Sequence, residues 1–250
     1  MNRIDRTEQK MQEIFRTSAV VNEGNDPEFM KILQRFIFGD VCYTGSLDTH
    51  IRELVTVTVL TTLNTLPQLK SHIQGSLNVG CTPIEIRETI YQCAPFIGFP
   101  RTLNAIGIMN EVFIENGIEL PLEEQGTVSD EDRYEKGLEL QKPIYGDEIE
   151  ERYSYLPDDF SGAIPRFLTE LCFGDFATRK GLDKKLRELF IVVILATMGG
   201  AEFQLKSHIY GALKVGNTKE EIVCALVHAS GYMGIPRLFN ALNTAKDLLN

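Results

Sequence analysis

The stretch RELVTVTVLTTLNTLPQLKSHIQGSLNVGCTPIEI at residues 52–86 decides the fold of this chain, because it occurs twice. Its second copy, RELFIVVILATMGGAEFQLKSHIYGALKVGNTKEEI, occupies residues 187–222 and carries one inserted residue just before LKSHI. The agreement extends outward to GFPRTLNA at 98–105 and GIPRLFNA at 234–241. A repeat of this length within one chain indicates a tandem duplication of a single structural unit.

The repeat also extends upstream, which fixes its boundaries. FGD at 38–40 matches FGD at 173–175, and DRTEQK at 5–10 echoes DRYEKG at 132–137. Between the copies, ELPLEEQGTVSDE is acidic and contains glycine, as expected of a connection. We therefore divide the chain into a first copy, a linker and a second copy: residues 1–118, 119–131 and 132–250.

Each copy has the pattern of α-helices. Apolar residues at Val57, Leu60 and Leu63 follow the helical period, although the segment is rich in β-branched residues. Gly80 is suited to a left-handed helix end, and Thr82 begins the next helix with the pattern of a capping box. We predict an all-α fold built by tandem duplication of one helical repeat.

Composition and charge exclude several classes of protein. The formal net charge of -10 leaves no general basic field for nucleic acid or an anionic membrane surface. The most apolar run, LFIVVILATM at 189–198, is far shorter than the ~18 residues that suggest a membrane span. The charged opening MNRIDRTEQK lacks a secretory signal. We expect a cytoplasmic globular protein that binds neither nucleic acid nor membrane.

The cysteines do not form a recognisable site. Their odd number and the absence of a CxxC or metal-ligand spacing argue against a secreted disulfide framework and against a metal site. No cysteine is matched by a cysteine in the other copy, so we interpret them as reduced packing residues: Cys42, Cys81, Cys93, Cys172 and Cys224.

Two of the four histidines, His72 and His208, occupy the same place in the repeated LKSHI. The helical period puts each of them at the edge of an apolar face. A core histidine that is hydrogen-bonded to a neighbour would explain one such residue. Its recurrence in the same setting favours a functional role. Because the residue inserted before the second LKSHI can close one pocket, we expect at least one functional site per chain.

Glu53 and Glu188 lie one helix earlier, each with apolar residues four and seven positions further on. That spacing turns the carboxylates toward the buried stripe, where a charge needs a partner. The partner is either an arginine, such as the adjacent Arg52 or Arg187, or the histidine of the same copy. A histidine partner would be oriented and made more basic by the carboxylate. Both alternatives stay open.

Arginines supply the candidate substrate-binding groups. Arg101 and Arg237 follow the prolines that open the last helix of each copy, where free backbone N–H groups and a guanidinium suit an anion. A solvated arginine or an interface ion pair would explain them equally well. Arg52 and Arg187 are the other two candidate substrate-binding arginines.

With these segments assembled, the sequence resembles the carboxymuconolactone decarboxylase family of the alkyl hydroperoxidase D-like superfamily. RELVTVTVL, LKSHIQGSLNVG and IGFPRTLNA carry the resemblance in the first half, and RELFIVVIL, LKSHIYGALKVG and MGIPRLFNA carry it in the second. The resemblance implies an all-α, alkyl hydroperoxidase D-like repeat that associates as rings. Single-copy members form hexamers, so we expect a homo-oligomer, a trimer with pseudo-sixfold symmetry.

The superfamily also contains peroxide-reducing proteins, whose CxxC precedes the histidine. In this sequence Glu53 and Glu188 match the superfamily glutamate, and His72 and His208 match its histidine. The cysteine positions are occupied by other residues: Thr65 and Gln68 in the first copy, Ala201 and Gln204 in the second. Without a thiolate nucleophile, peroxide reduction by that route is not available.

The resemblance implies decarboxylation of a small anionic substrate such as 4-carboxymuconolactone. The unsaturated lactone would accept the electrons released with CO2, so no cofactor is expected. The histidines would act as acids that the glutamates orient, and the arginines would anchor a carboxylate. Many members carry a small residue after the proline where this chain has arginine, which favours a different substrate. A redox protein and a non-catalytic ligand-binding or structural oligomer are the competing hypotheses.

Overall fold

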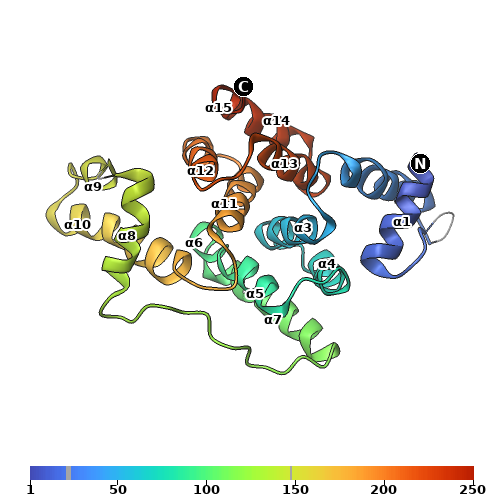
Figure 1. Ribbon diagram of the computed structural model, residues 1–250, viewed down its shortest axis with the longest axis horizontal. Helices are drawn as coiled ribbons and strands as arrows, with labels where there is room; N and C mark the ends of the chain where they lie inside the picture. Colours follow the sequence, from blue (N-terminus) through green and yellow to red (C-terminus); the bar gives the residue numbers. More distant parts are fainter. Residues whose placement is uncertain (21–23, 147) are drawn as a thin grey trace.

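The computed structural model describes residues 1–20, 24–146 and 148–250, and within these ranges it contains helices and no strands (Figure 1). The all-α prediction is therefore confirmed. In chain order the helices are α1 (Arg3–Phe15), α2 (Pro27–Gln34), η1 (Arg35–Asp40), η2 (Val41–Tyr43), α3 (Thr49–Leu63), α4 (Leu66–Asn78), α5 (Pro83–Tyr91), α6 (Ala94–Ile97), α7 (Phe99–Glu115), α8 (Arg133–Tyr145), α9 (Glu148–Arg152), α10 (Asp158–Phe167), η3 (Leu168–Ala177), α11 (Lys184–Met198), α12 (Glu202–Lys214), α13 (Lys219–Met233), α14 (Ile235–Thr244) and α15 (Lys246–Leu249). Within the described ranges, none of these helices combines the length and apolar character needed to cross a membrane.

The two copies have matching helices around a common centre. Helices α3, α4 and α5 of the first copy correspond to α11, α12 and α13 of the second. In Figure 1, α3 and α11 lie near the centre, whereas α1 and the group α8 to α10 lie at opposite ends. The N-terminal helices of the two copies, α1 and the group α8 to α10, are thus the outermost parts of the molecule.

Local sequence signals set the helix boundaries. The side chains of Asp48 and Asp183 accept backbone hydrogen bonds in the first turns of α3 and α11. Thr82 and Thr218 form the predicted capping boxes of α5 and α13. Gly80 has a φ of 93°, which agrees with the predicted left-handed end after α4.

A single hydrophobic core joins the copies. Leu54 and Val57 of α3 belong to the same buried cluster as Phe190 and Val193 of α11, and all four are fully buried. Apolar burial is the main stabilising term in folding, so each copy depends on the other for much of its stability. The duplication therefore produces one packed body rather than two independent domains.

The third helix of the repeat differs between the copies. In the second copy α13 is continuous, whereas in the first the chain leaves the helix after α5 and resumes as the short α6. Pro95 of α6 stands where α13 has Gly231, and a proline inside a helix removes a hydrogen bond and clashes with the preceding turn. Gln92 and Phe96, on either side of this break, line the cavity described below.

Helices α1 and α8 are equivalent, but not in the register suggested by DRTEQK and DRYEKG. Arg3 forms an ion pair with Asp40 (2.6 Å), and Arg133 forms one with Asp175 (2.8 Å). Arg133 thus corresponds to Arg3, whereas the sequence echo matched it to Arg6. The echo was wrong by three residues, because Arg3 and Arg133 are the residues that pair with the equivalent aspartates of the repeated FGD segments.

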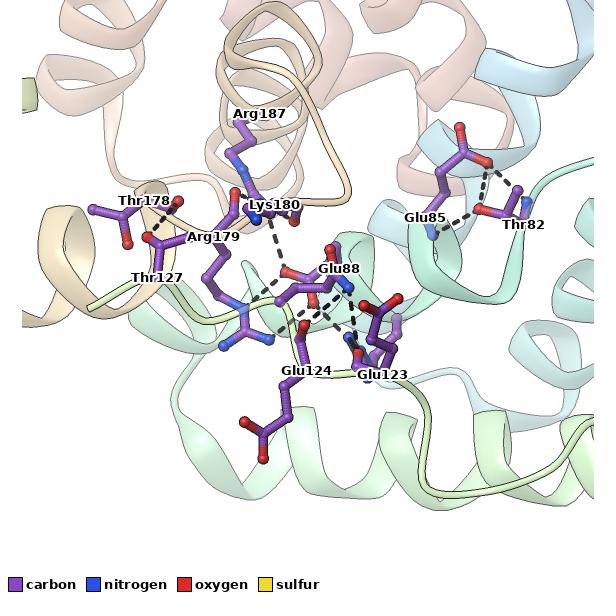
Figure 2. Close-up of polar contacts among 12 residues, drawn as sticks. Thr82, Glu85, Glu88, Glu123, Glu124, Thr127, Thr178, Arg179, Lys180 and Arg187 are labelled. Carbon is purple, nitrogen blue, oxygen red and sulfur yellow. Dashed lines mark hydrogen bonds and ion pairs between the residues drawn. The ribbon is translucent and has the colours of Figure 1, made fainter. Parts of the chain in front are cut away.

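The linker at 119–131 contains no helix and runs along one edge of the molecule from α7 to α8 (Figure 1). It is attached to the second copy by hydrogen bonds. The backbone N–H of Lys180 donates to the Gln125 carbonyl (2.9 Å), and the Thr127 hydroxyl donates to the Thr178 carbonyl (3.0 Å), as Figure 2 shows for the threonines.

Candidate active site

The second copy contains a cavity of about 670 Å³. Helices α8, α9 and η3 form one wall, and α11 and α12 form the opposite wall. The end of α5 and the short α6 add residues from the first copy. Segments of π-helix such as η3 frequently occur at functional sites, and η3 supplies Cys172, Phe173 and Phe176 to this cavity.

His208 and Glu188 form the polar centre of the cavity. Nδ1 of His208 lies 3.0 Å from Oε2 of Glu188, so the carboxylate is placed to accept the Nδ1 proton. Nε2 of His208 makes no hydrogen bond to any described residue. A histidine held in this way can accept or donate a proton through Nε2.

Tyr145 at the end of α8 is a third polar member of the cavity. Its hydroxyl lies 3.3 Å from Nδ1 of His208. Burial, together with the nearby charge of Glu188, raises the pKa of Tyr145 well above its usual value. The hydroxyl therefore remains protonated at neutral pH and can donate a hydrogen bond to a developing negative charge.

The first copy has the same histidine and glutamate pair, but aromatic rings pack against its histidine. Nδ1 of His72 lies 2.8 Å from Oε2 of Glu53, so the predicted hydrogen bond forms in both copies. The His72 ring is only 6% exposed and packs edge-on against Phe15 (5.2 Å) and Tyr232 (5.3 Å). This histidine matches the core alternative.

The difference in access arises from how closely the outer helices pack. At Gly75 of α4, an added Cβ would lie 2.7 Å from the Ile14 side chain of α1. At the equivalent Gly211 of α12, the nearest approach of α8 is the Tyr145 hydroxyl at 3.6 Å. Helix α1 is thus pressed onto α4, whereas α8 stands further from α12 and leaves space between them.

Each histidine also receives an aromatic ring from the other copy. Phe96 of α6 packs edge-on against His208 at 5.9 Å, and its counterpart Tyr232 packs against His72. Phe96 and Tyr145 were not among the residues predicted from the sequence. A signal for Phe96 was present, because both copies place an aromatic residue two positions before the glycine that precedes the last helix.

Arg52 has a structural role. Its guanidinium donates to the carbonyls of Leu47 and Thr44, both at 2.7 Å, and it is 2% exposed. Neither Arg52 nor Arg187 pairs with the adjacent glutamate, so the histidine is the glutamate's partner in both copies. Because its guanidinium is buried and hydrogen-bonded to backbone carbonyls, Arg52 is not available to a substrate, which corrects that prediction.

Arg187 differs because it lines the cavity. Its Nη2 donates to the carbonyls of Arg179 and Lys180, both at 2.9 Å, but its buried Nε has no hydrogen-bond partner among the described residues. Burial lowers the pKa of Arg187 and the neighbouring Glu88 opposes that effect, yet an arginine stays charged at neutral pH. Arg187 therefore remains a candidate anchor for an anion.

A cluster of arginines surrounds Glu88 beside the cavity (Figure 2). The buried carboxylate accepts from Nε of Arg179 (2.8 Å) and from Nε of Arg87 (3.3 Å), and Nη2 of Arg187 lies 3.4 Å away. Glu88 in turn raises the pKa of Arg179 by hydrogen bonding. Three guanidinium groups share one carboxylate, and Arg187 is the one of them that lines the cavity.

Arg101 and Arg237 lie outside the cavity that contains His208. Nη1 of Arg101 approaches the carbonyl of Thr62, near the end of α3, whereas Glu53 lies in the first half of that helix. Nine residues of helix separate Glu53 from Thr62, about 14 Å along the axis. Arg237 borders a small cleft near the end of α11. Within one chain the structure therefore does not bring these arginines together with the histidines, because the last helix begins at the far end of the helix that carries the glutamate.

The described residues offer neither a thiolate nor a metal cluster in the cavity. Cys172 lines it, but burial raises the pKa of that thiol to about 11. The thiol therefore stays protonated and is a weak nucleophile near neutral pH. No group of three His, Cys, Asp or Glu side chains that could hold a metal ion occurs within the described ranges.

Comparison with known proteins assigns the family. The sequence profile of the carboxymuconolactone decarboxylase family matches twice, at residues 27–111 and 162–247, once in each copy. The chain belongs to the carboxymuconolactone decarboxylase family. The matched ranges include both pairs of histidine and glutamate. Each copy of this tandem carboxymuconolactone decarboxylase family protein therefore contains one such pair.

Curated relatives of the family resemble about half of the chain. A 4-carboxymuconolactone decarboxylase of Acinetobacter baylyi is 28% identical over 121 residues, which are 48% of this chain and 90% of the relative. The nitrosuccinic acid decarboxylase npaB of Metarhizium robertsii is 28% identical over 117 residues, which are 47% of this chain and 81% of the relative. These names support a decarboxylase-like family.

A solved structure resembles the whole chain. It is provisionally described as a gamma-carboxymuconolactone decarboxylase subunit of Burkholderia xenovorans LB400 and superimposes with a TM-score of 0.53 at 20% identity. The match covers 98% of this family member and 96% of the solved chain. At this identity the likeness shows the fold alone, and it extends over both copies.

Proposed function

We propose that this chain is a decarboxylase that requires no cofactor and acts on a small organic acid of the 4-carboxymuconolactone type in the cavity of the second copy. The observation that carries the proposal is the bond between His208 and Glu188, with Nε2 of the histidine left without a partner among the described residues. The decarboxylase names of the relatives support the reaction class.

The proposed reaction breaks the bond between a ring carbon and a carboxylate. The electron pair moves through the unsaturated ring to a carbonyl oxygen, CO2 leaves, and a proton is then added to a ring carbon. Arg187 would hold a second carboxylate that is not lost, Tyr145 would donate to the developing oxyanion, and Nε2 of His208 would deliver the proton. Glu188 would stabilise the imidazolium between turnovers.

The two competing functions have less support. A thiol peroxidase would need a reactive thiolate, and burial raises the pKa of Cys172 in the cavity. A non-catalytic ligand-binding oligomer would not need a histidine and a carboxylate bonded at the cavity wall, although it would tolerate them.

The direct test is CO2 release by the purified chain, without added cofactor, from 4-carboxymuconolactone and from nitrosuccinate. We expect release from at least one of these acids, and no change after treatment with a chelator. Peroxide reduction that depends on Cys172, with no CO2 released from either acid, would replace the proposal by the redox alternative.

Replacing Tyr145 by phenylalanine should lower kcat by about 10²-fold, since removing one donor to an oxyanion typically has that effect. The fold should be retained, because Phe15 occupies the equivalent place beside His72. Steady-state kinetics of CO2 release would measure the change. Tyr155→Phe, at an exposed tyrosine, is the matched control. An unchanged kcat in the Tyr145 variant would remove the hydroxyl from the mechanism.

We also propose that the protein is a homo-oligomer, with a trimer as the expected state. The last helix of each copy exposes large apolar side chains at matching positions: Phe99 and Leu103 in α7, and Ile235 and Phe239 in α14. Repeated apolar surface of this kind is usually buried between subunits. Light scattering at micromolar concentration should give a multiple of 28.2 kDa. A monodisperse monomer would contradict this proposal.

A further inference from the structure

Gln92 is a buried polar residue that neither the fold nor the proposed mechanism uses. It follows the last turn of α5, lines the cavity of the second copy and is 3% exposed. Neither Oε1 nor Nε2 of its amide has a hydrogen-bond partner among the described residues. Native proteins rarely leave both ends of a buried amide unsatisfied without a functional reason.

The site around His72 shows what this position requires. There His228, the counterpart of Gln92 from the second copy, has its Nε2 2.9 Å from the Thr56 hydroxyl. In the second copy the place of Thr56 is taken by Ile191, which cannot form a hydrogen bond. The cavity around His208 thus has a polar side chain from the first copy at this place but no hydrogen-bonding partner for it, at a wall where Nε of Arg187 is also unpaired among the described residues.

The rest of the cavity is mainly apolar. Its lining includes aromatic and branched side chains from both copies: Phe96, Leu168, Phe173, Phe176 and Ile191. A volume of about 670 Å³ is in the range of pockets that enclose drug-sized ligands, about 300–1,000 Å³. A small lactone with two carboxylates would leave much of this apolar surface without a contact.

We infer that Gln92 and Arg187 together bind the oxygen atoms of an organic acid whose apolar, ring-bearing body fills the phenylalanine-lined part of the cavity. This inference rests on the proposed function, since it names the class of acid that the same site accepts. The Gln92 amide donates one N–H and Arg187 donates its Nε–H to the retained carboxylate. Because the amide has no competing partner among the described residues, it can turn toward the ligand without losing a hydrogen bond.

Calorimetric titration with three matched probes tests the ligand class. Trans-cinnamate carries a carboxylate and a phenyl ring, crotonate replaces the ring by a methyl group, and cinnamyl alcohol replaces the carboxylate by a neutral group. We expect the full chain to bind cinnamate at least tenfold more tightly than either of the others. Equal affinity for cinnamate and crotonate, or no binding of cinnamate, would overturn the inference.

Gln92→Leu tests the residue. It should weaken cinnamate binding about tenfold, because a hydrogen bond to a charged group is lost. Its melting temperature should stay the same or rise, since leucine removes an unsatisfied buried amide. Gln68→Leu, at an exposed position of α4, is the control and should change neither quantity. Unchanged affinity in Gln92→Leu, or weaker binding accompanied by a lower melting temperature, would make Gln92 a structural residue.

Binding is measured without turnover, so the two proposals can fail separately. If cinnamate binds as expected and Gln92→Leu weakens it, the inference about the ligand holds even where His208→Gln leaves CO2 release unchanged. That second result would remove only the proposed catalytic role of His208.

Discussion

His208→Gln should lower kcat for CO2 release by about 10²- to 10⁴-fold, the usual contribution of a positioned acid or base. Glutamine keeps a polar side chain of similar reach beside Glu188 but cannot transfer the proton. The cavity around His208 allows the new side chain to adjust, so stability should change little. Kinetics of CO2 release and the thermal melting temperature, measured on the same preparation, would separate the two effects.

The same substitution at His72 is the matched control and should have the opposite result. His72 is enclosed by Phe15 and Tyr232, and it is the hydrogen-bond partner of Glu53. His72→Gln should therefore destabilise the fold by about 1–3 kcal/mol and leave the kcat of the folded protein nearly unchanged. A large loss of kcat at His72, with His208→Gln fully active, would assign the reaction to the first copy.

Glu88→Gln should lower the free energy of unfolding by about 3–5 kcal/mol, the usual effect of removing one partner from a buried ion pair. Glu88 is fully buried, and its carboxylate contacts Arg87, Arg179 and Arg187. A neutral amide in its place would leave three guanidinium groups without their shared counter-charge. Because the chain has no tryptophan, urea unfolding should be followed by far-UV circular dichroism.

Glu124→Gln removes the same charge from an exposed residue of the nearby linker, labelled in Figure 2. It should change the free energy of unfolding by only a few tenths of a kcal/mol, up to about 0.5. Similar urea midpoints for the two variants would show that the arginine cluster does not depend on Glu88.

The repeat made the fold and half of the site predictable. Matching His72 with His208 and Glu53 with Glu188 identified two pairs, and both pairs are hydrogen-bonded in the structure. This prediction succeeded because helix periodicity sets which side chains share a face and a buried carboxylate requires a partner.

The remaining site residues depend on contacts between distant segments. Tyr145 is 63 residues from His208 in the chain and lies on a helix whose sequence echo was misleading. Gln92 belongs to the first copy, yet it lines the cavity around His208, which lies 116 residues further along the chain. Periodicity within one segment contains no information on such contacts.

The inserted residue allowed for unequal access to the two histidines, but the sequence did not predict which of them would be enclosed. The pentapeptide LKSHI is identical in both copies, and the difference lies in how closely α1 and α8 approach it. That spacing depends on how Ile14 packs against Gly75 and how Tyr145 packs against Gly211. Each contact joins two segments that are distant in the sequence.

The central claim is that the second copy, through His208, carries the reaction. Diethyl pyrocarbonate modifies accessible neutral imidazoles, and peptide mapping by mass spectrometry identifies which histidines have reacted at each stage of activity loss. We predict that CO2-releasing activity falls in parallel with modification of His208, while His72, at 6% exposure, and the fully buried His228 stay unmodified in the native protein. Activity that is lost while His208 is still intact, or that persists after His208 is fully modified, would contradict the claim.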